Sequence, residues 1–363
     1  MSTVAEFSLF QPEPVASWKN ENFKGSNELL VNLNEDDLQL LSDSANSIML
    51  ATSPNSPELN ISLGEINSEA AKLNNSDLFK KINDISEQKI IRGQGFVFIK
   101  RIPVESWGQH KSAIAFLLLS KLLGNLRSQN KLGHVLGHVV DLGLRSDDPN
   151  VRLYQTSERQ TFHTDSADIV TLLCIRPAME GGMSSIVSAG AIFNEMKLHR
   201  PDLLHRLFLP MATDRRGEIP IGQKPFFLIP VFSIHEGFLN VIYQRQYLDS
   251  AQRFKDAPQF TPLDIEALNY FDQLTNKPEM QLSIHLEPGD IQVLHNHSVL
   301  HDRSAFINHT DRKLRRHLLR AWICPLNDRP LPSVFADRFG SVTIGNRGGV
   351  QLEGINPIAE WDI

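Results

Sequence analysis

Two side chains suited to metal binding, His163 and Asp165, lie two positions apart in the segment QTFHTDSADIV, residues 160–170. Residues i and i+2 of an extended segment point to the same side, so both side chains can reach one ion. A mononuclear non-haem iron(II) centre uses two histidines and one carboxylate, which leaves positions open for a cosubstrate and O2. The pair therefore predicts such a centre only if a distant segment supplies a second histidine.

Candidates for that histidine occur late in the chain, in LEPGDIQVLHNHSVLHDRSAF, residues 286–306. A Pro-Gly pair predicts a turn, and DIQVL after it predicts a strand. Three histidines follow: His295, His297 and His301. Spacing alone does not select among them.

Two arginines follow in RRHLLRAWI, residues 315–323. Alternation along a strand places Arg316 and Arg320 on one face, together with a leucine and a tryptophan. On an edge strand these arginines would point into solvent. If they face inward, the planar guanidinium groups can hold a carboxylate through paired hydrogen bonds.

The remaining pattern predicts a mainly β protein with helical cover. Phe96–Lys100 alternates as a strand, and residues 106–124 predict a helix with Ser106 as N-cap and Gly124 as C-cap. Helical spacing also occurs over residues 66–90, 190–208 (broken near Pro201) and 262–275. From about residue 150, short apolar runs separated by Pro, Gly and Asp indicate a β-sandwich or jelly roll.

Composition excludes several classes of function. The net charge is -6 and the pI about 6.1, which argues against a nucleic-acid or anionic-membrane surface. No apolar run approaches the roughly 20 residues that span a bilayer. Cys174 and Cys324 lie in apolar runs and predict buried thiols in a reducing, cytoplasmic compartment.

The ordered motifs FHTD, VLHDR and RRHLLRAWI resemble those of the TauD/TfdA-like Fe(II)/2-oxoglutarate-dependent dioxygenases. The segments GQGFVFIKRIPV and GGMSSIVSA are similar to that family as well, and the resemblance covers about residues 90–325. It implies a double-stranded β-helix (jelly-roll) core within an α+β chain. We expect an N-terminal arm of irregular or mixed structure over residues 1–65 and a single catalytic domain over residues 66–363.

The resemblance also implies roles for individual residues. His163, Asp165 and His301 match the metal ligands and catalytic centre, whereas His295 and His297 would be structural or support the ligands. Arg316 matches the arginine that holds the remote carboxylate of 2-oxoglutarate. Arg320 matches a second arginine that would contact either the cosubstrate or an anionic substrate. Ser184 matches a residue that hydrogen-bonds the same carboxylate, and the adjacent Ser185 could take this role instead.

The activity implied by this resemblance is oxidation, most simply hydroxylation, of an unactivated C–H bond in a small molecule. Iron(II), 2-oxoglutarate and O2 would take part, and 2-oxoglutarate would become succinate and CO2. The carboxylate of Asp165 favours oxygenation over halogenation, because related halogenases have a small residue there. Two alternatives are an inactive metal-binding jelly roll and a zinc hydrolase, since zinc accepts the same ligand types.

Residues that could contact the substrate flank the first motif and form a second polar cluster, YQR, at residues 243–245. The candidates are Tyr154, Thr156, Gln160, Asp168, Tyr243 and Arg245, with ordinary surface polarity as the alternative for each. If Arg245, expected on a strand, or Arg320 faces the cavity, the pattern indicates an anionic or amino-acid-like substrate.

Overall fold

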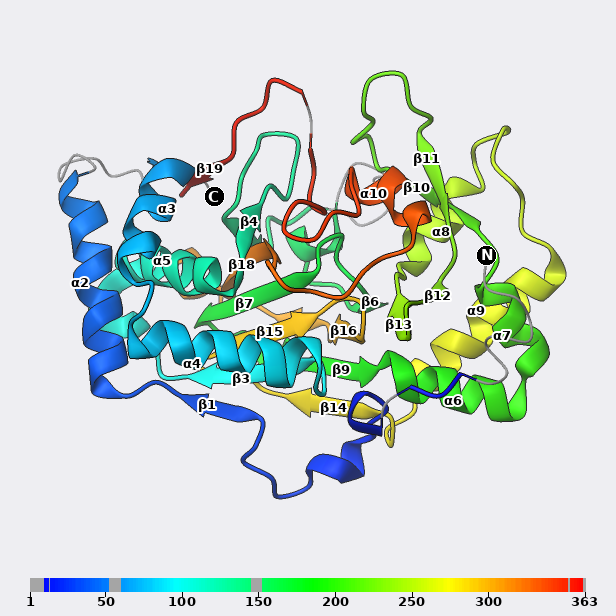
Figure 1. The fold of residues 1–363 in the computed structure, drawn as a ribbon, viewed down its shortest axis with the longest axis horizontal. Coiled ribbons are helices and arrows are strands. Elements are labelled where there is room, and N and C mark those ends of the chain that lie inside the picture. The colour runs from blue at the N-terminus through cyan, green and yellow to red at the C-terminus, as the bar shows by residue number, and fades with distance from the viewer. Residues whose placement is uncertain (1–9, 13, 52–59, 145–151, 352, 362–363) are drawn as a thin grey trace.

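A computed structural model describes residues 10–12, 14–51, 60–144, 152–351 and 353–361. Strands and helices are mixed, in an α+β arrangement with two main sheets at the centre. Helices α2 to α5 gather at one end of the molecule, and α6, α7 and α9 gather at the other (Figure 1).

The larger sheet has seven strands and its order is β1-β3-β15-β7-β18-β4, with β5 also paired to β18. Its strands are β1 (Leu30–Asn32), β3 (Phe96–Lys100), β4 (Asn125–Arg127), β5 (Gly137–Val140), β7 (Ile169–Arg176), β15 (Ile291–His295) and β18 (His317–Cys324). Strand β1 runs parallel to β3, and the other pairs are antiparallel. The central strands are buried on both faces, which explains their nearly continuous apolar sequences.

The smaller sheet has four antiparallel strands in the order β14-β9-β16-β6. These are β6 (Gln160–His163), β9 (Ser184–Ser188), β14 (Gln281–Ile284) and β16 (Val299–Arg303). One hydrophobic cluster joins the sheets, with Phe96 and Leu318 from the larger sheet and Ile186 and Val299 from the smaller one. The sheets therefore pack face to face, and side chains on their inner faces can meet between them.

Helices cover the outer face of each sheet. The helices are α2 (Glu35–Ala51), α3 (Leu63–Lys72), α4 (Asp77–Ile85), α5 (Val104–Leu123), α6 (Ala189–His199), α7 (Pro201–Leu207), α8 (Arg245–Ala251), α9 (Pro262–Thr275) and α10 (Ala336–Phe339). Residues of α2 to α5 share a core with the larger sheet, and residues of α6, α7 and α9 share one with the smaller sheet.

Four two-stranded ribbons complete the fold. They are β2 (Asn60–Ser62) with β19 (Ile358–Glu360), β8 (Glu180–Gly181) with β17 (Phe306–Ile307), β10 (Met211–Asp214) with β11 (Phe226–Ile229), and β12 (Phe232–His235) with β13 (Phe238–Val241). The pairing of β19 with β2 joins a segment near the C-terminus to the start of α3.

Several predicted elements are confirmed. Strand β3 and helix α9 have the expected bounds, and α6 and α7 are separated at Pro201. Gly124 is the C-cap of α5 with φ 156°. The prediction for Ser106 is wrong, because α5 begins earlier and its N-cap is Pro103.

Part of the expected arm of irregular or mixed structure, residues 1–65, is the regular helix α2. This helix packs Leu41, Ala45 and Ile48 into the core shared with α5. Its start is capped reciprocally: the Asp37 amide donates to Asn34 Oδ1 at 2.8 Å, and the Asn34 amide donates to Asp37 Oδ2 at 3.0 Å. Residues 1–9, 13 and 52–59 of the predicted arm lie outside the described residues.

No helix in the described part of the chain is long and apolar enough to cross a membrane.

Candidate metal centre and adjoining cavities

His163, Asp165 and His301 meet on the inner side of the smaller sheet. His163 ends β6, and its register partner across the ladder is His301 in the middle of β16. Their ring centroids are 4.1 Å apart. One ligand atom from each of the three residues lies within 4.8 Å of the others, and all three are buried. The sheet register thus brings together two segments that are far apart in the sequence.

Asp165 lies in the turn after β6, and three hydrogen bonds fix this turn and its carboxylate. The Asp165 amide donates to Asn296 Oδ1 at 3.0 Å, and Asn296 Nδ2 donates to the carbonyl of Ala167 at 2.9 Å. The indole of Trp322 donates to Asp165 Oδ2 at 2.9 Å. A ligating carboxylate that is itself hydrogen-bonded is held in one orientation toward the metal.

The charge on Asp165 is balanced by Arg320. Nη1 of Arg320 lies 3.4 Å from Oδ1 and 3.5 Å from Oδ2 of this carboxylate. Burial opposes ionisation of Asp165, but Arg320 and the neighbouring histidines outweigh burial and lower its pKa to about 2. Asp165 is therefore ionised, as a metal ligand must be.

The two histidines are neutral at physiological pH. Burial and the neighbouring His163 ring lower the pKa of His301 to about 3, and burial also lowers the pKa of His163. Nδ1 of His163 donates to the carbonyl of Thr161 at 2.8 Å, which leaves Nε2 with a lone pair toward the site. Gln160 Nε2 lies 2.9 Å from that Nε2. Two neutral imidazoles and a carboxylate are the donors that divalent iron accepts.

A buried cavity adjoins the two histidines, and Arg316 lies in its wall. The cavity is lined by His163, His301, Arg303, Arg316 and Ser184, together with Val139, Tyr154, Gln160, Leu172, Leu286, Asp302, Leu318 and Arg320. Burial and the charge of Arg303 lower the pKa of Arg316 to about 9. Nη1 of Arg316 is buried and has no hydrogen-bond partner among the described residues. A buried guanidinium nitrogen without a partner is costly unless an anion binds there.

The serines predicted as alternatives point in different directions. Ser184 lines the cavity, and its hydroxyl donates to Gln292 Oε1 at 2.6 Å. The Ser185 hydroxyl lies 2.7 Å from that of Ser283, and Ser185 does not line the cavity. Ser184 is therefore the serine placed beside Arg316.

A second pocket opens on the Asp165 side of the same cluster. Tyr154, Gln160 and Arg320 line both pockets, with the Arg320 guanidinium 4.7 Å from the Tyr154 ring centroid. The rest of its lining is Asp165, Ser166, Arg152, Leu153, Arg216, Gln244, Gln246, Tyr247, Trp322 and Arg338. The three candidate ligands thus lie between a cavity containing Arg316 and a pocket rich in arginine.

Two substrate candidates, Thr156 and Asp168, do not line either pocket. Thr156 is buried and its hydroxyl donates to the carbonyl of Leu153 at 3.0 Å. Asp168 is fully buried, and its Oδ1 accepts hydrogen bonds from His297 at 2.7 Å and from Arg347 at 2.9 Å. Their predicted contact with substrate finds no support, since both are committed to internal contacts.

Tyr243 and Arg245 are also directed elsewhere. The Tyr243 hydroxyl donates to Asp272 at 2.6 Å, and its main-chain atoms bond Thr164 in the turn before Asp165. Arg245 is the first residue of α8, not a strand residue as expected, and it forms ion pairs with Asp249 and Asp272. Neither side chain lines the pockets beside the metal cluster.

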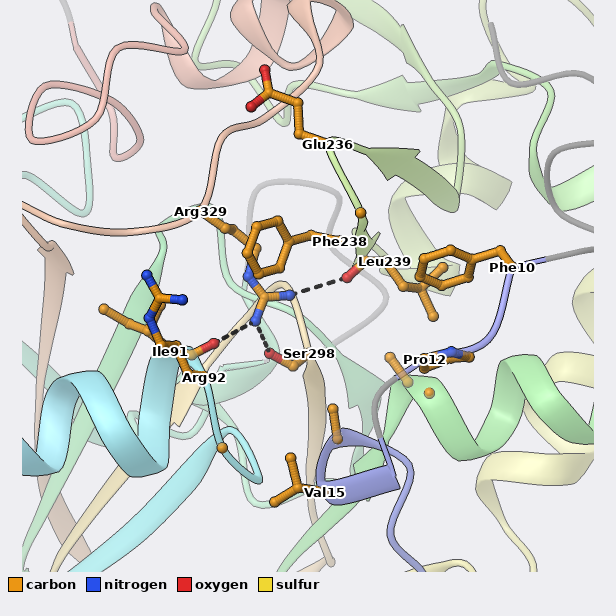
Figure 2. Close-up of a pocket in the computed structure, with 15 residues that line it drawn as sticks. Phe10, Pro12, Val15, Ile91, Arg92, Glu236, Phe238, Leu239, Ser298 and Arg329 are labelled. Atoms are coloured by element: carbon orange, nitrogen blue, oxygen red, sulfur yellow. Dashed lines mark hydrogen bonds between the residues drawn. The ribbon is translucent and has the colours of Figure 1, made fainter.

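A further cavity of about 400 Å³ lies away from the cluster (Figure 2). It lies between residues 10–12 and 14–16 of the N-terminal segment, the end of the helical segment Ser86–Ile91, and the β12–β13 hairpin. Arg329 in its wall donates to the carbonyls of Ile91 at 2.8 Å and Leu239 at 3.1 Å, and to Ser298 Oγ at 3.2 Å. None of the three candidate ligands lines this cavity.

Sequence reasoning missed Arg303 and three of the four arginines of the second pocket. Arg303 follows His301 by two residues on β16, so strand alternation could have placed it on the same face. Arg152, Arg216 and Arg338 come from segments that are far apart, and no local pattern predicts that they converge.

A family model described as taurine catabolism dioxygenase TauD, TfdA family matches residues 63–322. Among curated proteins, an FR-33289 synthase of Streptomyces rubellomurinus is 32% identical over 70% of this chain and 76% of its own length. A taurine hydroxylase-like protein of Stachybotrys chartarum is 27% identical over 84% of this chain and 77% of its own length.

Solved structures support the fold. An asparagine oxygenase crystallised with Fe(II), 2S,3S-3-hydroxyasparagine and succinate superposes with a TM-score of 0.63 at 17% identity, over 82% of this chain and 93% of that chain. The non-heme iron oxygenase OrfP, in complex with Fe and alpha-ketoglutaric acid, superposes with a TM-score of 0.57 at 13% identity, over 81% and 93%.

The fold and the site define an iron(II)- and 2-oxoglutarate-dependent dioxygenase. The chain belongs to the TauD, TfdA family.

Proposed function

We propose that this dioxygenase hydroxylates a small molecule at an unactivated C–H bond, with His163, Asp165 and His301 as the iron ligands. We further propose that Arg316, assisted by Ser184 and Arg303, receives the remote carboxylate of 2-oxoglutarate. Bound iron and 2-oxoglutarate would supply the oxidising chemistry, with release of succinate and CO2. A further relative, 30% identical over 46% of this chain, is a uridine-5'-phosphate dioxygenase of Amycolatopsis sp, and one structural neighbour is the asparagine oxygenase. From both we infer only that the substrate of this chain is a small molecule.

The assignment depends on one observation: Nη1 of Arg316, in the cavity that His163 and His301 also line, has no hydrogen-bond partner among the residues that the structure describes. A carboxylate placed there would complete the hydrogen bonding of this guanidinium. The cosubstrate could then reach the metal with its other end. The donor set fits iron(II), because two neutral imidazoles and one ionised carboxylate leave the remaining positions open.

The remaining residues of the site would orient groups and exclude water. Asn296 and Trp322 would hold Asp165 in place, and Arg320 would balance its charge until a metal shares that role. Leu172, Leu286 and Leu318 give the cosubstrate cavity apolar walls, which would keep water away from the reacting centre.

The alternatives account for less of the site. A zinc hydrolase would use the same three ligands, but it would leave a buried arginine beside them without an anion. A binding protein that had lost turnover would have no need of both a full ligand set and an adjoining cavity with a buried arginine.

We also propose that the two facing sheets form a double-stranded β-helix, and that residues 66–363 are one catalytic domain. The face-to-face packing of the two sheets supports the first point. Both cysteines are free and buried, which fits the reducing conditions of the cytoplasm.

Anaerobic titration with 2-oxoglutarate tests the assignment. Protein loaded with iron(II) should develop a weak visible charge-transfer band as 2-oxoglutarate is added. Arg316→Gln should raise the half-saturating concentration by about a hundredfold, the effect of losing a buried charged pair, without changing iron affinity.

The matched control is Arg312→Gln, because Arg312 is exposed and lies four residues away. It should behave as the unaltered protein does. An unchanged 2-oxoglutarate requirement in Arg316→Gln would refute the cosubstrate assignment, and no band in the unaltered protein would refute the proposed function.

A further inference from the structure

We propose that the arginine pocket, defined by Arg152, Arg216 and Arg338, binds a phosphoryl or phosphonyl group of the substrate. This inference rests on the proposed function, because it names the chemical class of the molecule that is oxidised. The pocket also contains Asp165, so the anionic group would lie close to the iron.

The three arginines reach the pocket from separate parts of the fold. Arg152 precedes the short helical turn Leu153–Gln155, Arg216 follows β10, and Arg338 lies on α10. Nε of Arg338 donates to Ser166 Oγ at 2.9 Å, and Ser166 is next to Asp165 in the chain. The pocket is therefore tied directly to the turn that carries a candidate iron ligand.

Positive charge in the pocket is only partly balanced. Glu218 is paired with Arg152, and Arg152 also donates to the Tyr247 hydroxyl at 3.4 Å. Among the described residues, no carboxylate forms an ion pair with Arg338. Burial lowers the pKa of Arg338; the nearby charge of Glu218 opposes this shift, and the charge of Arg152 adds to it. An anion bound between these guanidinium groups would offset their mutual repulsion.

The lining favours a doubly charged tetrahedral anion over an amino acid. Asp165 is the sole carboxylate among the residues that line the pocket, and it is already bonded to Trp322 and paired with Arg320. An ammonium group would therefore find no free acidic partner there. Tetrahedral phosphoryl oxygens can accept from several guanidinium forks at once, whereas a carboxylate has two oxygens and a single charge.

Neutral donors and aromatic surface complete the pocket. Gln244, Gln246 and the Tyr247 hydroxyl line it beside the arginines, and the Arg216 guanidinium lies 5.4 Å from the Tyr247 ring centroid. Such groups can orient an anion without adding negative charge. Arg320 separates this pocket from the cavity of Arg316, so cosubstrate and substrate anions would bind on opposite sides of one arginine.

Calorimetric titration of the anaerobic iron(II) protein tests the inference. Saturating 2-oxoglutarate is present throughout, so that the Arg316 cavity is filled and does not capture the probe. Uridine 5′-phosphate is compared with uridine, and propylphosphonate with butyrate. At least one phosphorus-bearing probe should bind tenfold or more tightly than its partner, and the pair that responds distinguishes an ester from a phosphonate.

Arg338→Gln should remove this preference, reducing affinity for the responding probe at least tenfold, whereas Arg338→Lys should restore part of it. The matched control is Arg200→Gln, because Arg200 pairs with Asp202 and Glu266 far from the pocket. If Arg338→Gln does not fold, the two probe pairs on the unaltered protein decide alone.

The outcomes separate the two proposals. A charge-transfer band with 2-oxoglutarate, but no preference for either phosphorus-bearing probe, would overturn the substrate class and leave the proposed function intact. A preference that survives in Arg338→Gln would overturn the arginine pocket as its cause. Absence of the band would overturn the proposed function and this inference with it.

Discussion

Two buried clusters of histidine and carboxylate lie side by side in this protein, and they differ in what occupies their centre. His163, Asp165 and His301 form one, and Asp168, His297 and Asp328 form the other. In both clusters the potential ligand atoms lie within 4.8 Å of one another. By residue type and spacing alone, either could hold a metal.

The second cluster already contains a cation. Nε of Arg347 donates to Asp168 at 2.9 and 3.0 Å, and Nη2 donates to Asp328 at 3.1 Å. His297 donates to Asp168 at 2.7 Å, and His295 donates to Asp328 at 3.0 Å. All of these side chains are buried, so Arg347 takes the place that an ion would need.

In the cluster of His163, Asp165 and His301, the neighbouring cation, Arg320, pairs with the single carboxylate. Arg320 contacts Asp165 at 3.4 Å, and both imidazoles line the cavity that contains Arg316. The comparison teaches that ligand types do not define a metal centre. A metal centre also needs ligands that no buried arginine already bridges, and an adjoining cavity from which a cosubstrate can reach the metal.

The largest expected effect separates the histidines of the two clusters. His301→Ala should reduce 2-oxoglutarate-dependent succinate formation by about a thousandfold or more, because an iron ligand is lost. His297→Ala should retain most of its activity once folded protein is compared with folded protein. The reverse order would show that the two clusters have been assigned the wrong way round.

Arg347→Met should destabilise the protein by about 3–5 kcal/mol, since it leaves two buried carboxylates without their cation. Urea unfolding monitored by circular dichroism gives this value. Arg92→Met is the matched control, because Arg92 is exposed and lies 3.8 Å from its partner Glu87. A loss below about 1 kcal/mol in Arg347→Met would mean that this cluster is not held together by its arginine.

Asn296 connects the two clusters. Its side-chain oxygen accepts a hydrogen bond from the Asp165 backbone amide at 3.0 Å, and its backbone amide donates to the carbonyl of Asp168 at 2.8 Å. Asn296→Ala should weaken iron binding about 10–100-fold, as expected when the support of a ligand is removed. Equilibrium dialysis against iron(II) measures this. Unchanged affinity would mean that Trp322 alone orients Asp165.

The smallest effect concerns His295, which burial keeps neutral with a pKa lowered to about 4. As the pH falls below about 6.5, the unfolded chain takes up a proton that native His295 does not. Stability is therefore lost by about 1.4 kcal/mol for each pH unit between roughly pH 6 and pH 4. Urea denaturation at several pH values should show that the free energy of unfolding falls less steeply with decreasing pH in His295→Gln than in the unaltered protein. Equal slopes would contradict a neutral His295 in the native protein.

Much of the site could be predicted from the sequence because most of its parts lie on regular strands or directly after one. Strand alternation placed His163 beside Asp165, and Arg316 and Arg320 on one face, and the structure brings these residues to adjoining cavities. Arg303 was within reach of the same reasoning, since it follows His301 by two positions.

The rest depends on contacts between distant segments. Asp168 was indistinguishable from a substrate contact in the sequence, because its partner Arg347 is far away in the C-terminal region. Arg245 was misplaced because the strand pattern before it ends in the start of α8. Helix α2 was missed because the surrounding segment is rich in polar residues, although Leu41, Ala45 and Ile48 recur at helical spacing; packing against α5 supplies its stability.

Iron stoichiometry is the most direct test of the central claim that one cluster binds iron and the other does not. Anaerobically loaded, desalted protein is analysed for iron per chain in three forms: unaltered, Asp165→Ala and Asp168→Asn. The account predicts one iron in the unaltered protein, none in Asp165→Ala and one in folded Asp168→Asn. Two irons in the unaltered protein, or iron retained in Asp165→Ala, would contradict it.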